Sequence, residues 1–466
     1  MSPRQPSART LYSTLPVALL WSRVTTGNRQ TYRRPSPPRI EEGLFRWEGI
    51  DLNRLADERP TPFFLFSETR LIDNLASVTR GLGASRLPAV IRYCAKTNPE
   101  LAIQEKLASA GASMLASTPE EVALALEAGF TAERIAYQRP VLGGALRDAV
   151  GFGVRFVHAY RLSDLAIIEQ AAAKAGVTLS VSLRIRDERG GMRILGSAAQ
   201  RLGLSPDEAV DAAGRFVSLP HLNLVALNSY IGTQQTGLAR FSSSIQLLCS
   251  TAVRIRKSCG IEIEEVNIGG GIPSDTLRRV SLSNVLGRVS DSVPEPRMAL
   301  DEFASGVGEI LKRELQTAPF VRRVAAEPGR SIVGNAAVLV TRVMEVQGRW
   351  LFLDASHNYL CESPLLFNRR IDAAPKRGND GYRYYNLSGC TLNTLDVIDW
   401  RRRLPPLDRG DLLVISDAGA YSLARAARYA GMSPAAYMID RDGEIRTVRR
   451  AETHEDLAAA MTRRQP

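Results

Sequence analysis

The sequence predicts an α/β protein, in which a (β/α)8 barrel of the TIM type is followed by a second, mainly β domain. Two observations lead to this prediction. Between residues 90 and 327, short apolar runs alternate with Ala- and Leu-rich stretches, which is the rhythm of strands and helices that follow one another along a chain. From Ser331 onward, short Val- and aromatic-rich runs separated by Gly, Pro and Asp are typical of β-strands joined by turns.

Eight of the apolar runs are expected to be barrel strands. They cover residues 90–95, 113–116, 134–138, 154–159, 178–185, 222–229, 264–268 and 323–327. The helices expected between them include residues 119–128, 163–175, 206–216 and 241–257. Eight strand-then-helix units match the size of a (β/α)8 barrel, and an open, doubly wound sheet is the structural alternative.

The rest of the chain is divided by composition. Residues 1–45 are expected to be a disordered or leader segment, because the first 40 residues carry seven arginines and no acid, with Ser, Thr and Pro throughout. A transit peptide has the same composition. Residues 46–70 are expected to supply an N-terminal strand, at 61–66, that joins the β domain. Residues 71–330 then form the barrel, and residues 331–466 form the C-terminal β domain.

Composition argues against several classes of function. The net charge of +11 comes from arginines scattered among acids, with no nucleic-acid-binding motif, so a solvated basic surface is favoured over a nucleic-acid partner. No apolar run approaches the ~18 residues of a membrane span. Five widely spaced cysteines and four histidines show no metal-ligand spacing and no disulfide framework, so no metal is expected. This cysteine usage is typical of a reducing compartment and predicts a cytoplasmic protein.

Lys96 is the first candidate for chemistry. It follows the apolar run that ends at residue 95, and Asn98-Pro99 turns the chain directly behind it. At the end of a buried strand, desolvation disfavours the ammonium form and favours the neutral amine that forms imines. A lysine that extends its charge to the surface is the alternative.

Two Gly-containing turns follow the last two predicted strands. Gly269-Gly270-Gly271 allows backbone N–H groups to approach an anion, and Gly329-Arg330 adds a fixed positive charge. The last two strand ends of such barrels commonly bind phosphate. Glu327, beside the second turn, is placed to keep a pyridine nitrogen protonated, or else to pair with Arg330. An imine lysine, a phosphate site and a carboxylate for a ring nitrogen together describe a site for pyridoxal 5'-phosphate.

At this point the chain resembles the alanine-racemase-like (fold-type III) pyridoxal-phosphate enzymes, and among them the diaminopimelate/ornithine decarboxylase family. The resemblance extends from about residue 60 to 423 and is carried by five motifs in the family's order. They are Tyr-Cys-Ala-Lys-Thr-Asn at 93–98, Asn-Ile-Gly-Gly-Gly at 267–271, Glu-Pro-Gly-Arg-Ser at 327–331, Gly-Cys at 389–390 and Asp-Ala-Gly-Ala-Tyr at 417–421.

The resemblance implies a role for each matching residue. Lys96 forms the imine with the cofactor, and Glu327 pairs with its pyridinium nitrogen. The phosphate is held by Gly269, Gly270, Gly271, Gly329, Arg330 and Tyr421. Cys390 protonates the carbanionic intermediate and is delivered across a homodimer interface into the partner's site. A thiol suits this role because its pKa lies close enough to neutral for it to give up a proton, and a buried structural thiol is the alternative.

The chain also departs from the family's pattern. Tyr230 stands where the family usually has a histidine stacked on the cofactor ring, and a tyrosine can still stack there. Thr391 follows the cysteine where these decarboxylases place a glutamate or an aspartate. Glu362, Ser363 and Phe367 lie in the segment that supplies the family's arginine and tyrosine for the substrate's distal carboxylate. A missing guanidinium removes a bidentate contact with that carboxylate.

These residues predict a homodimeric, pyridoxal-phosphate-dependent decarboxylase of an amino acid or an amino-acid-derived intermediate, with meso-diaminopimelate not expected as substrate. Glu362 and Thr391 are the candidate substrate-binding residues, and Glu362 is equally consistent with binding a cationic side chain and with an exposed surface acid. An amino-acid racemase or epimerase of the same fold is one alternative. A non-catalytic protein that binds pyridoxal phosphate is the other.

Overall fold

A computed structural model describes most of the chain after the leader. The described residues are 34–186, 201–280, 296–360, 362, 366–375, 381–459 and 461. The first 33 residues, for which a leader is expected, lie outside the described residues. Among the described helices, none is long and apolar enough to cross a membrane.

Eight parallel strands form a closed barrel, as the sequence predicts. Their order around the barrel is β5, β6, β7, β8, β9, β10, β11, β13, and β13 pairs with β5 to close it. The strands are β5 (Ala89–Cys94), β6 (Ser113–Ala116), β7 (Ile135–Tyr137), β8 (Phe156–Ala159), β9 (Leu179–Arg184), β10 (Leu222–Asn228), β11 (Glu265–Asn267) and β13 (Arg323–Ala326). Closure rules out the open, doubly wound sheet, because each strand has a neighbour on both sides.

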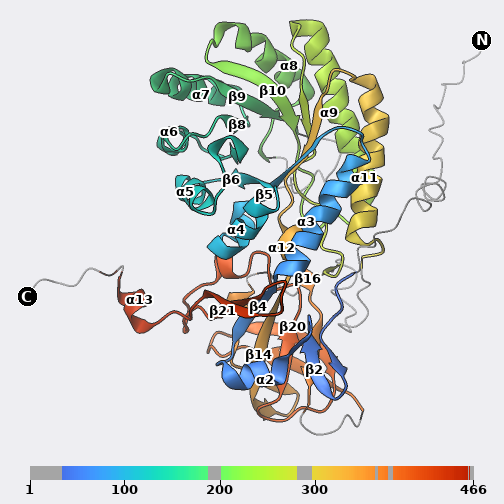
Figure 1. Cartoon of the computed structure of the whole chain (residues 1–466), viewed down its shortest axis with the longest axis vertical. Coiled ribbons are helices and arrows are strands. Elements are labelled where there is room, and N and C mark those ends of the chain that lie inside the picture. Colours follow the sequence, from blue (N-terminus) through green and yellow to red (C-terminus); the bar gives the residue numbers. More distant parts are fainter. Residues whose placement is uncertain are drawn as a thin grey trace, which may run out of the picture. The chain divides into compact units, whose positions relative to one another are not determined.

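Helices surround the barrel strands, the first of them before β5 and the others after a barrel strand (Figure 1). They are α3 (Glu68–Gly83), α4 (Leu101–Ser109), α5 (Pro119–Glu127), α6 (Gly144–Gly151), α7 (Leu162–Ala175), α8 (Pro206–Arg215), α9 (Leu238–Cys259) and α11 (Leu300–Glu314). The sequence marks their ends. Thr118 caps α5 by accepting a hydrogen bond from the backbone N–H of Glu121, and Gly176 ends α7 in the left-handed conformation.

The second domain is built on a nine-stranded sheet. Its strands are β4 (Phe63–Ser67), β14 (Ala337–Gln347), β15 (Trp350–Leu353), β17 (Ile371–Ala374), β18 (Arg383–Ser388), β19 (Val397–Leu404), β20 (Leu412–Ile415), β21 (Ala435–Ile439) and β22 (Ile445–Arg449). The early strand β4 lies between two late ones, antiparallel to β14 and parallel to β21. The sequence prediction of a mainly β second domain is therefore confirmed.

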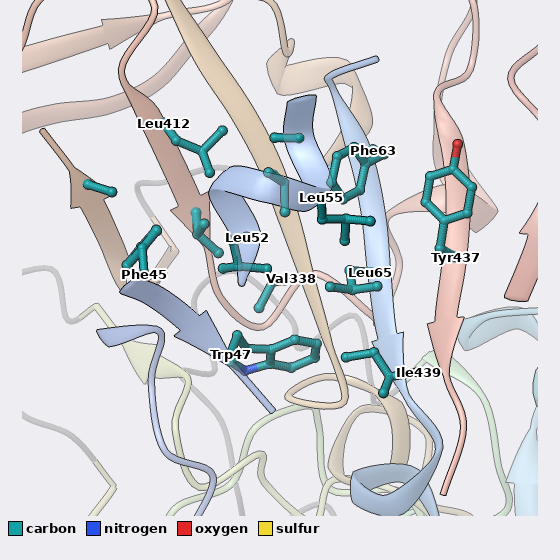
Figure 2. Close-up of a cluster of buried hydrophobic side chains, with 14 of the residues drawn as sticks. Phe45, Trp47, Leu52, Leu55, Phe63, Leu65, Val338, Leu412, Tyr437 and Ile439 are labelled. Carbon is teal, nitrogen blue, oxygen red and sulfur yellow. The ribbon is translucent and has the colours of Figure 1, made fainter. Parts of the chain in front are cut away.

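The core of this domain joins segments far apart in the sequence. Figure 2 shows Phe63 and Leu65 of β4 beside Val338 of β14 and Ile439 of β21. The five strand residues of β4 are all buried, which explains why the first four, Phe63 to Phe66, are continuously apolar rather than alternating.

The N-terminal boundary differs from the prediction. The expected leader extends to residue 45, yet β1 (Arg39–Glu41) already pairs with β2 (Leu44–Trp47) in a hairpin. Strand β3 (Ile50–Asp51) and helix α2 (Leu52–Glu58) follow. Phe45 and Trp47 pack into the core of the β domain, so burial of these aromatic side chains fixes a segment whose composition is polar elsewhere (Figure 2).

Short elements complete the described chain. They are η1 (Ala95–Thr97), η2 (Ala132–Arg134), η4 (Phe216–Ser218), β12 (Arg278–Arg279), η6 (Leu315–Thr317), α12 (Arg330–Val333), η7 (His357–Tyr359), β16 (Phe367–Asn368), η8 (Leu423–Arg425) and α13 (His454–Ala459).

Candidate active site

A pocket of about 240 Å³ lies at the carboxyl ends of the barrel strands. This is the end of a (β/α)8 barrel at which functional residues collect. Most of the residues singled out from the sequence line it: Lys96, Tyr230, Gly270, Gly271, Glu327, Gly329, Arg330 and Tyr421. Cys390, Glu362, Thr391 and Gly269 are not among the lining residues.

Lys96 lies in η1, two residues after the end of β5, with its side chain at the pocket. The sequence argument expected burial to lower the pKa of its amine. In the structure the pKa of Lys96 is raised instead, because the neighbouring Cys94 thiol, Tyr421, Tyr230 and Glu327 together outweigh the effect of burial. The position of the lysine is as expected, but its free amine is held in the ammonium form.

Glu327 is a buried carboxylate that faces the pocket from the end of β13. Asn267 donates a hydrogen bond from Nδ2 to Oε1 of Glu327, at 2.7 Å, and Nε2 of His158 lies 3.2 Å from the same oxygen. Burial alone would raise the pKa of this carboxyl group. His158, Arg92 and Asn267 outweigh burial and lower the pKa of Glu327 to about 2. Glu327 is therefore an anion in the lining of the pocket.

The glycine turns pack so closely that a side chain at these positions would collide with neighbouring atoms. A Cβ on Gly271, whose φ is +105°, would lie 2.4 Å from the carbonyl oxygen of Gly232. A Cβ on Gly329 would lie 2.1 Å from Oγ1 of Thr97. Beside these turns the buried Nε of Arg330 makes no hydrogen bond with a described residue. Backbone cradles with an unused buried donor fit the phosphate group of pyridoxal phosphate.

The guanidinium of Arg330 is already paired. Both of its terminal nitrogens donate to the carboxylate of Glu362, one of them at 2.9 Å. Arg369 donates to the same carboxylate at 3.0 Å, and all three side chains are at least nine-tenths buried. Glu362 is thus neither an exposed surface acid nor an open cation site. This ion pair limits the phosphate contact expected of Arg330 to its Nε and to its charge. Ser363 lies outside the described residues.

Sequence reasoning missed a set of polar residues in the same pocket. Tyr160 and Arg184 follow β8 and end β9, and the guanidinium of Arg184 lies 5.3 Å from the ring centre of Tyr230 and 5.6 Å from that of Tyr160. The Tyr160 hydroxyl donates to Gln138 at 3.0 Å. The rule that found Lys96, widened to any polar residue within one position of the end of a predicted strand, would also have found Gln138, Tyr160 and Arg184.

The segment from Gly389 to Asp396, here called the Cys390 loop, lies outside the pocket of its own chain. The buried carboxylate of Asp396 accepts hydrogen bonds from Ser356, from the backbone of His357 and from both the backbone and hydroxyl of Thr391. Thr391 therefore stabilises the loop and does not point into the pocket. Cys390 is exposed as a residue, but its sulfur is partly shielded from water, and this shielding together with the charge of Asp396 raises the pKa of the thiol. Leu392 and Leu395 beside it are 103% and 78% exposed.

Known proteins resemble the chain over most of its length. Residues 71–334 match the family model described as pyridoxal-dependent decarboxylase, pyridoxal binding domain. A diaminopimelate decarboxylase of Methanothermobacter thermautotrophicus is 28% identical over 420 residues, which are 88% of this chain and 93% of that protein. A diaminopimelate decarboxylase of Zymomonas mobilis is 26% identical, over 90% of this chain and 97% of that one.

Solved structures show the same fold. The diaminopimelate decarboxylase of Methanocaldococcus jannaschii, crystallised with L-lysine, superposes with a TM-score of 0.79 at 22% identity, covering 91% of this chain and 98% of that one. The lysine decarboxylase of Selenomonas ruminantium superposes with a TM-score of 0.70 at 22% identity, covering 86% and 98%.

Proposed function

The chain belongs to the pyridoxal-dependent decarboxylase family, and on this basis we propose that the pocket around Lys96 is where it removes the carboxylate of an amino acid. The observation that supports this proposal most strongly is that Lys96, Glu327, Gly270, Gly271 and Gly329 line one pocket although they come from three strand ends. A lysine, an anion and a backbone cradle in a single cavity are what this cofactor requires.

Each residue has a separate task in this proposal. Lys96 binds the cofactor aldehyde covalently, Glu327 holds a proton on the ring nitrogen, and Tyr230 packs against the ring. Gly270, Gly271 and Gly329 bind the phosphate with their backbone, joined by Tyr421 and by Nε of Arg330. When bound, pyridoxal phosphate withdraws the electron pair that remains after carbon dioxide leaves. The walls of the pocket exclude water while this charge is present.

Reprotonation of the substrate is assigned to Cys390 of a second copy. Cys390 is exposed on its own chain, is not a pocket residue there, and is flanked by the exposed Leu392 and Leu395. An apolar rim around an exposed thiol fits an interface between copies of this chain. The raised pKa of Cys390 keeps the sulfur protonated at neutral pH, which a proton donor requires. We therefore propose a homodimer with two shared sites.

The substrate is proposed to lack a distal carboxylate. The names of the relatives favour meso-diaminopimelate, and at 26–28% identity relatives can differ in substrate. Glu362 occupies the fork of Arg330 and also binds Arg369, so neither guanidinium is free to bind a second carboxylate bidentately. A side chain without a carboxylate fits this arrangement, because it needs no free guanidinium.

The experiment uses cofactor-loaded protein in heavy water with separate pools of L- and D-amino acids, including meso-diaminopimelate, L-lysine and L-ornithine. Loss of carbon dioxide with deuterium gained at Cα is the expected result, and the Lys96→Ala variant serves as the control. Deuterium gain with the carboxylate retained would contradict decarboxylation. Turnover of meso-diaminopimelate above the monocarboxylic amino acids would contradict the substrate proposal alone. Silence across all pools would contradict free amino acids as substrates.

A cytoplasmic location is also proposed. The four cysteines among the described residues are all free thiols, which fits a reducing compartment. Immunoblotting of cell fractions tests this location, and recovery of the protein in an organelle or an envelope fraction would contradict it.

A further inference from the structure

We propose that His158 is a positioning residue that holds one oxygen of the Glu327 carboxylate, so that the other oxygen is presented to the ring nitrogen of pyridoxal phosphate. The inference rests on the proposed placement of the cofactor in the pocket. His158 was not singled out from the sequence, where four scattered histidines show no pattern. Its neighbours become visible only in the folded barrel.

Geometry separates the two oxygens of Glu327. His158 lies in β8, is completely buried, and places Nε2 3.2 Å from Oε1. Asn267, from β11, donates to the same oxygen at 2.7 Å, and its own Oδ1 accepts from the backbone N–H of Gly269. Both of these polar contacts are with Oε1, and neither the hydrogen bond from Asn267 nor the approach of His158 involves Oε2. Because Glu327 lines the pocket, Oε2 is the oxygen available to a ligand.

The imidazole has no other polar partner in the described part of the chain. Neither ring nitrogen makes a well-aligned hydrogen bond there, and the approach of Nε2 to Oε1 is close without being linear. Burying an imidazole without a partner costs about 1–3 kcal/mol. Hydrogen bonds at active sites are often poorly aligned before a ligand binds and tighten afterwards. The contact with Glu327 therefore accounts for the presence of a histidine at this buried position.

The charged side chains near Glu327 have other partners or another role. Arg92, from β5, pairs bidentately with Glu265 at 2.6 and 2.9 Å, and Arg323 binds the same glutamate at 2.8 Å. Arg92 acts on Glu327 only through its charge, whereas His158 touches the carboxylate. Lys96 faces the same pocket and is proposed to bind the aldehyde. The orientation of the carboxylate is thus set by two residues, Asn267 and His158.

The test compares two ligands on the full-length protein. One is pyridoxal phosphate, and the other is its carbocyclic analogue in which a C–H group replaces the ring nitrogen. Dissociation constants for both are measured by fluorescence titration for the wild type, His158→Phe and His158→Asn. Asparagine keeps an N–H donor, and phenylalanine keeps only the ring. His221→Phe is the matched control, because His221 pairs with Glu169 at 2.7 Å and is not a pocket residue.

The ratio of the two dissociation constants isolates the contact with the ring nitrogen. His158→Phe is expected to reduce the preference for pyridoxal phosphate over the analogue by about tenfold, the effect of losing one hydrogen bond to a charged group. His158→Asn should restore most of the preference, and His221→Phe should leave it at the wild-type value. A general packing defect would weaken both ligands equally and leave the ratio unchanged.

An unchanged or increased preference in His158→Phe would overturn the inference. Should that variant fail to fold, His158→Asn and Asn267→Ala decide, since a role in positioning Glu327 requires Asn267→Ala to lower the preference as well. Failure of this inference is distinguishable from failure of the proposed function. A wild-type protein that binds neither ligand would overturn the placement of the cofactor itself.

Discussion

The pocket and the Cys390 loop are both expected to take part in one reaction, yet they lie in different parts of the chain's surface and are held by different contacts. The pocket is assembled within one chain, where eight strand ends bring Lys96 and Glu327 together. The Cys390 loop is held by Asp396 away from that pocket, with two leucines exposed beside it.

The difference separates two parts of the chemistry. Binding the cofactor and withdrawing electrons need only the pocket of one chain. Returning a proton to the substrate, if Cys390 supplies it, needs a second copy. The four predictions below test this division, and they are ordered from the largest expected effect to the smallest.

Replacing Lys96 tests whether the pocket carries the chemistry. Lys96→Ala is expected to lower turnover by on the order of a thousandfold, because the covalent attachment of the cofactor is lost. Borohydride reduction followed by peptide mass spectrometry checks this, since the cofactor's mass should appear on the Lys96 peptide of the wild type only. Lys96→Arg keeps the charge and should fail in the same way. A cofactor adduct on another lysine would contradict the prediction.

The buried anion of the pocket should also shape acid stability. Glu327 has its pKa lowered to about 2 from a usual 4.5, so its contribution is complete above about pH 4.5 and is lost as the pH falls toward 2. The size of the effect is about 3 kcal/mol. Urea unfolding between about pH 3 and 6 should show a shallower pH dependence for Glu327→Gln than for the wild type.

Glu58→Gln is the control for this measurement, because Glu58 has an exposed side chain on α2. A shallower slope in Glu327→Gln than in Glu58→Gln would assign the effect to the buried carboxylate. Identical slopes for all three proteins would mean that Glu327 is not held as a low-pKa anion in solution.

Replacing Cys390 tests the division between the two regions directly. Cys390→Ala should lower turnover by about a hundredfold and leave cofactor affinity unchanged, because the thiol acts only as a proton donor. Mixing this variant with Lys96→Ala should restore up to about a quarter of the wild-type activity, since half of the dimers are mixed and each has one intact site. Cys259→Ala, another free thiol, is the control. No recovery on mixing would place Cys390 outside a shared site.

The smallest effect on folding is expected from the leucines of the Cys390 loop. The double variant Leu392→Ser with Leu395→Ser should change the free energy of unfolding of the chain by less than about 0.5 kcal/mol, because both side chains are exposed. Sedimentation should nevertheless show weakened dimers. Val217→Ser, at a position 94% exposed elsewhere on the barrel, is the matched control. Dimers as stable as those of the wild type would contradict a role for this loop in association.

Much of the fold could be predicted from the sequence, because strands buried on both faces are rich in apolar residues and a barrel repeats that pattern from strand to strand. The eight expected strands correspond to the eight observed, with boundaries shifted by a few residues. Lys96, Glu327 and the glycine turns were singled out for the same reason, since each lies at the end of a predicted strand or directly after it. The end of the leader was misplaced because Phe45 and Trp47 pack into a core that includes residues almost 300 positions later in the sequence, such as Val338.

Which side chains contact one another could not be predicted from the sequence. The sequence left Glu362 open between a cation site and a surface acid, and the structure pairs it with Arg330 and Arg369. Thr391 was a candidate for substrate binding, yet it hydrogen-bonds to Asp396 within its own loop. The role of His158 could not be predicted, because the sequence around a histidine in an apolar strand is the same whether or not a carboxylate lies across the barrel.

What the sequence by itself determined is the set of elements and the residue types at their ends, because local propensity and burial are written into neighbouring positions. Only the tertiary structure decided which charges meet. The contact of Glu327 with His158 and the ion pair of Glu362 with Arg330 depend on the tertiary fold, which sets distances of a few ångströms between segments far apart in the chain. Electrostatic energy falls off with those distances, and no pattern along the sequence encodes them.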